Sequence, residues 1–244
     1  MPPTLLAHAP TSAPTASANR LLAALPRKDY QRFLAGCDTV ELSFTEVLTE
    51  PEERIRYLYF PTGSYISLVT PIDGLASLEV GLVGDEGMIG ISLILGMDRS
   101  PLRAVVQGQG PSLRMNTAQF RRELEQSPAL HRELKHYLYV VMRQMAQTAA
   151  CTRFHLVEAR LARWLLMSQD RAHAKSFHVT HEFLAYMLGV RRVGITKAAT
   201  SLHNRKLISY SRGDITITDR NGLEAASCTC YAADKASYKR VMGY

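Results

Sequence analysis

The segment Val179–Ile208 constrains the fold more than any other part of this 244-residue chain. Thr180 is a good N-cap, and apolar residues at helical spacing follow it. A helix-turn-helix needs a small residue in its first helix, a turn residue that tolerates positive φ, and a buried aliphatic residue in its second helix. Ala185, Gly189 and Ile195 meet these needs at offsets of four and six residues. The surrounding apolar positions are filled by Leu184, Leu188, Val190 and Ala198. The segment therefore predicts a helix-turn-helix, and a helical hairpin with a fortuitous glycine is the alternative.

The second helix, about Arg191–Arg205, presents basic residues on its outward face. A recognition helix lies in the major groove of duplex DNA with its N-terminal turns facing base edges. Arg192 is the expected bidentate partner of a guanine, whereas Arg191 and Lys197 are expected at phosphates, with Lys197 also a weaker base contact. The other residues expected at this interface are Thr180, His181, Val193 and Gly194. An ordinary solvated helix surface is the alternative for each.

A hairpin is predicted directly after this helix, over Leu207–Ile217. Two β-prone runs flank Ser211-Arg212-Gly213-Asp214, which is typical of a hairpin tip. In this position the hairpin is the wing of a winged helix. We expect Ser211 and Arg212 to reach a phosphate and Asp214 to stabilise the turn.

The net charge of +7 is concentrated in this part of the chain. Residues 158–244 hold 14 Lys and Arg against 7 Asp and Glu, whereas residues 1–157 hold 15 of each. A basic module beside a neutral one favours a polyanionic partner for that module alone. A solvated basic surface would give the same count.

The first half of the chain has a different residue pattern. Residues 1–19 are mostly Ala, Pro, Ser and Thr, and we expect a disordered tail. Asn19 can cap a first short helix, and a second ends at Gly36. Short β-prone runs punctuated by glycines follow, over Ile55–Phe60, Ser64–Thr70, Leu75–Val83, Arg103–Gln107 and Ser112–Met115. This spacing predicts a compact antiparallel roll within residues 20–127.

A long helix is predicted over residues 128–155, opened by Ser127 and Pro128. Its apolar residues recur in steps of three and four and give one stripe, which can pack on the roll. The other side would then stay exposed unless a second copy covers it, so we expect a dimerisation helix. A core helix in a monomer is the alternative. Residues 156–244 would form the third domain, and the fold class is α+β.

The four cysteines, Cys37, Cys151, Cys228 and Cys230, have a spacing typical neither of a disulfide framework nor of a zinc site. We therefore expect free thiols in a reducing cytoplasm, and no metal and no cofactor. The sequence has no apolar run long enough for a membrane span and no secretory signal. Nucleophile elbows, P-loops and dinucleotide fingerprints are also missing from it, so we do not expect an enzyme.

With these segments in place, the chain resembles the Crp/Fnr family of bacterial transcription regulators. The resemblance covers nearly all of residues 20–225 and is most specific over Glu158–Leu166 and Thr180–Thr196. It implies a cyclic-nucleotide-binding-like β-roll, a long dimer helix and a winged helix-turn-helix. It also implies a homodimer on a palindromic DNA operator, with half-sites about one helical turn apart, and contact with RNA polymerase. Val193 stands where the cyclic-AMP receptor has a glutamate, so a different operator is expected.

The sensory site departs further from the family pattern. A cyclic-nucleotide site would need a glutamate for the ribose and an Arg-Ser or Arg-Thr pair followed by Ala for the phosphate. The candidates here are Glu86, Arg99, Ser100 and Arg103, but Pro101 follows the Arg-Ser pair. We therefore do not expect cyclic-nucleotide binding, and the effector stays unknown. An iron–sulfur sensor would need an N-terminal cysteine cluster where only Cys37 stands, and residues 40–127 offer no His or Cys to a haem.

Two functions remain after this reading. The first is a sequence-specific, DNA-binding transcription regulator. The second is a ligand-binding module whose winged helix mediates protein contacts. The position of the positive charge favours the first, and strong salt dependence of DNA binding would separate the two.

Overall fold

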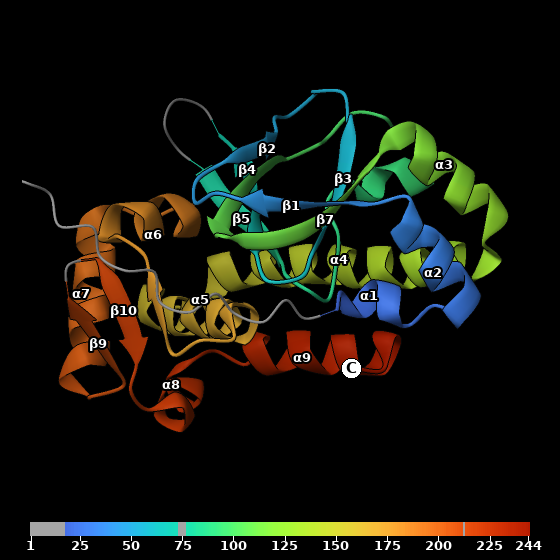
Figure 1. The fold of residues 1–244 in the computed structure, drawn as a ribbon. Coiled ribbons are helices and arrows are strands. Elements are labelled where there is room, and N and C mark those ends of the chain that lie inside the picture. Colours follow the sequence, from blue (N-terminus) through green and yellow to red (C-terminus); the bar gives the residue numbers. More distant parts are fainter. Residues whose placement is uncertain (1–17, 73–76, 212) are drawn as a thin grey trace, which may run out of the picture.

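The computed structural model describes residues 18–72, 77–211 and 213–244. A β-roll lies above one long helix, and a winged helix closes one end of the molecule (Figure 1). The expected order of roll, long helix and winged helix-turn-helix is confirmed. Within the described ranges, no helix is both long enough and apolar enough to cross a membrane.

The roll consists of two antiparallel sheets. One has the strand order β1 (Asp38–Leu42), β7 (Gly110–Asn116), β3 (Tyr57–Pro61). The other has the order β2 (Val47–Thr49), β6 (Arg103–Gly108), β4 (Tyr65–Pro71), β5 (Ser77–Val83). β1 and β2 were not among the strands expected from the sequence; both are short, and most of β1 is exposed. A 3-10 helix, η1 (Ile91–Leu95), lies between β5 and β6.

Helices cover one side and one end of the roll. They are α1 (Arg20–Ala23), α2 (Arg27–Ala35) and α3 (Thr117–Gln126). Most of the expected disordered tail, residues 1–17, lies outside the described residues. Its last residue, Asn19, is buried and caps α1 by accepting a hydrogen bond from the backbone N–H of Leu22. The tail therefore ends before Asn19.

The long helix α4 runs from Pro128 to Phe154, with Ser127 as its N-cap. One face packs on the roll through Leu130, Leu134 and Tyr137, all at most 1% exposed. A helix that the sequence analysis did not anticipate, α9 (Cys230–Met242), lies alongside α4 (Figure 1). The chain thus returns after the winged helix to cover a second flank of α4.

The winged helix comprises α5 (Val157–Ala172), β8 (Ser176–His178), α6 (His181–Leu188), α7 (Arg192–Asn204), β9 (Ile208–Ser211), β10 (Asp214–Ile217) and α8 (Arg220–Ala226). Its strands form a small sheet in the order β8-β10-β9. Its core is continuous with part of the roll, because Tyr65, Val69 and Leu82 belong to the same apolar cluster. The winged helix therefore packs directly against the roll.

Candidate nucleic-acid interface

The turn between α6 and α7 has the geometry that the sequence predicts. Gly189 caps α6 with φ +61°, in the left-handed region, and its N–H donates to the carbonyl of Ala185. Thr180 caps the other end of α6 through the backbone N–H of Phe183, at 3.1 Å. Ile195 is completely buried and belongs to the apolar cluster that also holds residues of α5 and α6. These contacts fix how α7 stands on α6.

The face of α7 opposite this core is basic and open. Arg191, Arg192 and Lys197 are exposed, and none of them forms an ion pair with another described residue. Val193 lies beside them with 59% of its surface exposed. Three unpaired cations at the N-terminal end of one helix favour an anionic partner, since an intramolecular role would need acidic neighbours.

Two residues on this face were missed by the sequence analysis. Thr196 and Thr200 are exposed, and Thr196 stands one helical turn after Arg192. The hydroxyl of Thr196 lies 3.3 Å from Nδ1 of His181, which links α7 to the start of α6. Partial burial and the charge of Arg192 lower the pKa of His181. The helical spacing from Arg192 was the signal that could have identified both threonines.

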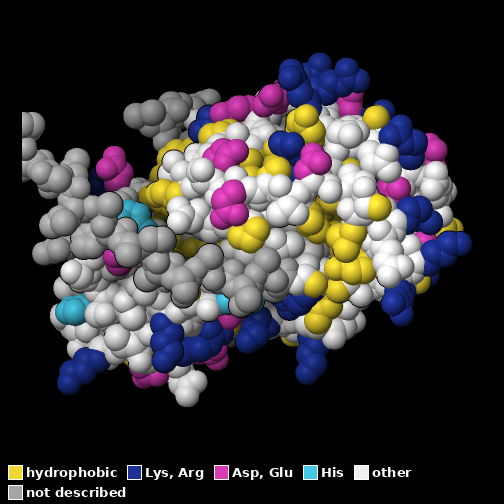
Figure 2. Space-filling view, in the orientation of Figure 1, with side chains coloured by type: hydrophobic (Ala, Val, Ile, Leu, Met, Phe, Trp, Pro, Cys, Tyr) yellow, Lys and Arg dark blue, Asp and Glu magenta, His cyan; other side chains and the backbone are white. Residues whose placement is uncertain are grey.

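The predicted wing is the hairpin of β9 and β10, in which Asp214 pairs with Ser211. Ser211 is exposed at the tip, whereas Arg212 lies outside the described residues. Asp214 also lies 3.0 Å from Nδ1 of His178 in β8, so it ties the tip to a third strand. Lys and Arg side chains gather along the lower edge of the molecule in Figure 2, on the side of α8 and α9.

α5 holds three buried arginines, each directed to a different neighbour. Arg160 donates to the backbone carbonyl of Leu188 at the end of α6. Arg163 forms an ion pair of 2.6 Å with Asp234 of α9. Arg171 forms an ion pair with Glu86, in the loop after β5. A buried guanidinium that loses its partner is costly, so these three contacts hold α5 against α6, α9 and the roll.

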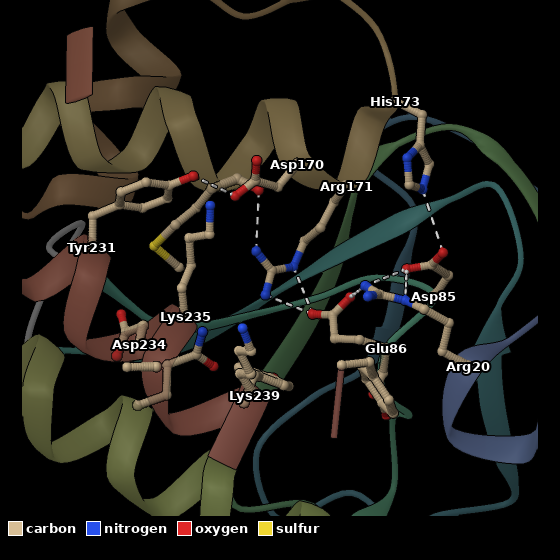
Figure 3. A pocket seen from close by; sticks show the side chains of 15 residues that line it. Arg20, Asp85, Glu86, Asp170, Arg171, His173, Tyr231, Asp234, Lys235 and Lys239 are labelled. Carbon is tan, nitrogen blue, oxygen red and sulfur yellow. Dashed lines mark hydrogen bonds and ion pairs between the residues drawn. The ribbon is translucent and has the colours of Figure 1, made fainter. Parts of the chain in front are cut away.

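A cavity of about 510 Å³ lies between α9, α5 and the loop after β5 (Figure 3). Glu86 lines it, and both Nε and Nη2 of Arg171 contact the same carboxylate oxygen at 2.7 and 2.5 Å. Arg20 forms an ion pair with the neighbouring Asp85 at 3.0 Å. From α9, Lys235 and Lys239 contribute to the lining. The acidic groups of the cavity are thus already held by cations of the chain.

The structure does not bring the four candidate effector residues together. Of them, only Glu86 lines the cavity. Arg99 is exposed and donates to the carbonyl of Glu52, and Ser100 donates to the carbonyl of Leu102. Arg103 forms an ion pair of 2.7 Å with Glu50 and reaches the hydroxyl of Tyr186. These residues form no common phosphate site, and the Arg171 pair occupies the one carboxylate expected at a ribose.

The four described cysteines are free, as expected from the sequence, but three of them lie closer together than their spacing along the chain indicated. The described cysteines form no disulfide, but Cys151, Cys228 and Cys230 lie together with His155. The Sγ atoms of Cys151 and Cys228 are 3.5 Å apart, although 77 residues separate them. No local spacing could reveal a set that forms only when α9 packs on α4. Burial and the nearby acids raise the pKa of the remaining thiol, Cys37, to about 12.

Comparisons with known proteins agree with this architecture. Residues 159–226 match the Crp-like helix-turn-helix domain, whereas no curated protein matches the sequence. A Crp/Fnr family transcriptional regulator from Eubacterium rectale has a similar fold, with a TM-score of 0.66 at 16% identity, over 84% of this chain and 96% of that one. FixK2 from Bradyrhizobium japonicum gives 0.67 at 13% identity, over 79% and 98%. The c-di-GMP-responsive regulator CLP of Xanthomonas campestris gives 0.65 at 16%, over 79% and 99%.

Proposed function

We propose that this chain, which carries a Crp-like helix-turn-helix on the fold of Crp/Fnr regulators, is a transcription regulator that binds a palindromic DNA site as a homodimer. The single observation that carries the proposal is the division of α7 into two faces. Ile195 and Leu202 are fully buried, whereas Arg191, Arg192 and Lys197 face solvent unpaired among the described residues. α7 is therefore held rigidly while its cations stay free for phosphates and base edges.

Arg192 is proposed to read a guanine through O6 and N7. Such a contact contributes about 1–3 kcal/mol of discrimination against other bases. We expect Arg192→Ala to relax specificity at one base pair of each half-site when bound sequences are selected from a random pool. Uniform weakening on all sequences would instead assign Arg192 to a phosphate. Arg121→Ala is the matched control, because Arg121 is also exposed but lies on α3, far along the chain from the winged helix.

Salt dependence separates this function from a winged helix that binds protein. Each neutralised phosphate releases counterions, so the logarithm of the DNA affinity should fall linearly with the logarithm of the salt concentration. Fluorescence anisotropy with a duplex measures this slope. We expect Lys197→Ala to reduce the slope by about one per half-site. A flat salt profile would favour protein contacts and contradict DNA binding by α7.

The dimer is proposed to form along the face of α4 that neither the roll nor α9 covers. Exposed residues recur there in alternating steps of four and three: Lys135, Tyr139, Met142, Ala146, Ala149 and Arg153. Tyr139 is 47% and Met142 is 61% exposed. This period is that of a two-stranded coiled coil, and the alanines allow close approach of a second α4. A second copy is the occupant that matches a regular helical seam, because it presents the same stripe.

The oligomeric state tests this seam directly. We expect sedimentation equilibrium to give a dimer for the wild type and a weakened dimer for Met142→Glu, because a carboxylate would lie in the apolar part of the seam. Met97→Glu is the matched control, since Met97 is 59% exposed but follows η1 in the roll. A dimer unaffected by Met142→Glu would contradict the seam. RNA polymerase as partner and the cytoplasm as location belong to the same proposal.

A further inference from the structure

Three cysteines and one histidine from two distant segments meet where α4 ends and α9 begins. Cys151 lies in the last turn of α4 and His155 caps that helix, whereas Cys228 lies two residues before α9 and Cys230 is its first residue. Each offers one ligand atom, and these four atoms all lie within 4.8 Å of one another. We propose that this Cys3His set binds one zinc ion, which fastens α9 to α4. The proposal does not depend on DNA binding.

The separations fit a single tetrahedral ion. With Zn–S bonds of about 2.3 Å and a Zn–N bond of about 2.0 Å, two thiolates lie roughly 3.8 Å apart and a thiolate and an imidazole nitrogen roughly 3.5 Å apart. Here Cys151 Sγ lies 3.5 Å from Cys228 Sγ, and Cys230 Sγ lies 3.5 Å from Nδ1 of His155. An iron–sulfur cluster would spread its ligands over more than one iron. The compact set therefore favours one ion, and Cys3His is a common structural zinc set.

The surroundings suit a site of negative charge. Three thiolates around Zn²⁺ carry a net charge of −1. Arg160 is buried beside the cluster, and no described carboxylate lies within ion-pair distance of it. The negative thiolates would supply the charge that Arg160 otherwise lacks. Nε2 of Gln147 donates to Cys230 Sγ at 3.0 Å, the kind of outer hydrogen bond that orients a metal ligand.

The place of the site in the fold gives the ion a structural task. The apolar cluster at this point is small: among the described residues it consists of the three cysteines, with Ala159 packed against them. The position of α9 against α4 nevertheless matters for two other contacts. Asp234 of α9 pairs with Arg163 of α5, and α9 forms one wall of the cavity. A metal crosslink between residues 77 positions apart stabilises this arrangement by closing a long loop.

Metal analysis of the full-length protein, purified in reductant without chelator, tests the proposal. We expect about one zinc ion per chain by mass spectrometry. After exchange, Co²⁺ should give the visible absorption of tetrahedral cobalt with thiolate charge-transfer bands. In the native holoprotein a thiol reagent should react with Cys37 at most, because burial raises the pKa of that thiol, and three more cysteines should react after chelation. No zinc, with no cobalt spectrum and no protection of thiols after zinc is added back, would overturn the proposal, as would an iron–sulfur spectrum.

Single substitutions assign the ligands. Cys228→Ser and His155→Gln should each reduce the zinc content and shift the cobalt spectrum, because each removes one donor. Cys37→Ser is the control, since Cys37 lies in the roll outside the cluster, and it should retain full zinc. Loss of zinc in Cys37→Ser with retention in Cys228→Ser would contradict the site. If Cys228→Ser does not fold, the cobalt spectrum and the thiol count of the wild-type protein still show whether the site binds a metal ion.

Discussion

Two glycines near the turn between α6 and α7, Gly189 and Gly194, allow a test in which replacement by alanine should change the free energy of unfolding in opposite directions. Gly189 has φ +61°, a region that costs an L-residue about 1–2 kcal/mol. An added Cβ would also lie 3.2 Å from the backbone carbonyl oxygen of Ser77 and 3.3 Å from Cδ1 of Leu78. The leucine side chain can move, but Ser77 belongs to β5 and is held. We therefore expect Gly189→Ala to lower the free energy of unfolding by about 1–2 kcal/mol.

Gly194 provides the matched control five residues away. It lies in the first turn of α7 with ordinary helical geometry, and a Cβ there meets nothing within 4 Å. Because glycine in a helix is about 0.5–1 kcal/mol less stable than alanine, Gly194→Ala should stabilise the protein by that amount. The two substitutions should shift the unfolding midpoint in opposite directions.

Urea unfolding followed by circular dichroism, at fixed protein concentration and pH 7, measures both shifts. When the variants share the same dependence of the free energy of unfolding on urea, their midpoints can be compared directly, without extrapolating that free energy to zero urea. A Gly189→Ala protein as stable as the wild type would refute the strained turn. Equal destabilisation by both substitutions would show that neither position behaves as its backbone geometry requires. DNA affinity would not separate the two effects, because Gly194 lies on the proposed DNA-binding face.

Three further outcomes follow from buried side chains. Asp234→Ala should lower the free energy of unfolding by about 3–5 kcal/mol, because it leaves the buried Arg163 without its carboxylate, and thermal unfolding measures this loss. Ile195→Ala should cost about 2–5 kcal/mol in urea unfolding by opening a cavity under α7, and an unchanged midpoint would contradict the packing. Burial raises the pKa of Glu79 from 4.5 to about 7. Its folded state therefore binds the proton more tightly, so stability should fall as pH rises from 4.5 to 7. In Glu79→Gln that fall should be smaller, and identical pH profiles for the two proteins would refute the assignment.

Local patterns predicted the winged helix well. The needs of the turn at Gly189, the cap at Thr180 and the buried Ile195 all depend on neighbours within about twenty residues. The glycine-punctuated strands of the roll were predicted for the same reason. β1 and β2 were missed because β2 has only three residues and β1 is mostly exposed, so neither carries a strong apolar alternation.

Contacts between distant segments were beyond the reach of these patterns. The pairing of Glu86 with Arg171 joins the roll to α5 across 85 residues, and it uses a carboxylate that the sequence suggested for a ligand. The meeting of Cys151 with Cys228 depends on where α9 packs, and nothing in the sequence after the wing indicated that α9 returns to α4. Side chains whose partners lie in another domain produce no periodic pattern in the sequence around them.

The three arginines of α5 connect this helix to three other parts of the molecule. One holds the helix-turn-helix, one holds the returning C-terminal helix, and one holds the roll. Tilting the winged helix relative to the roll would separate Arg171 from Glu86 and leave two buried charges without partners, at a cost of several kcal/mol. The orientation of the winged helix relative to the roll therefore depends in part on this one ion pair.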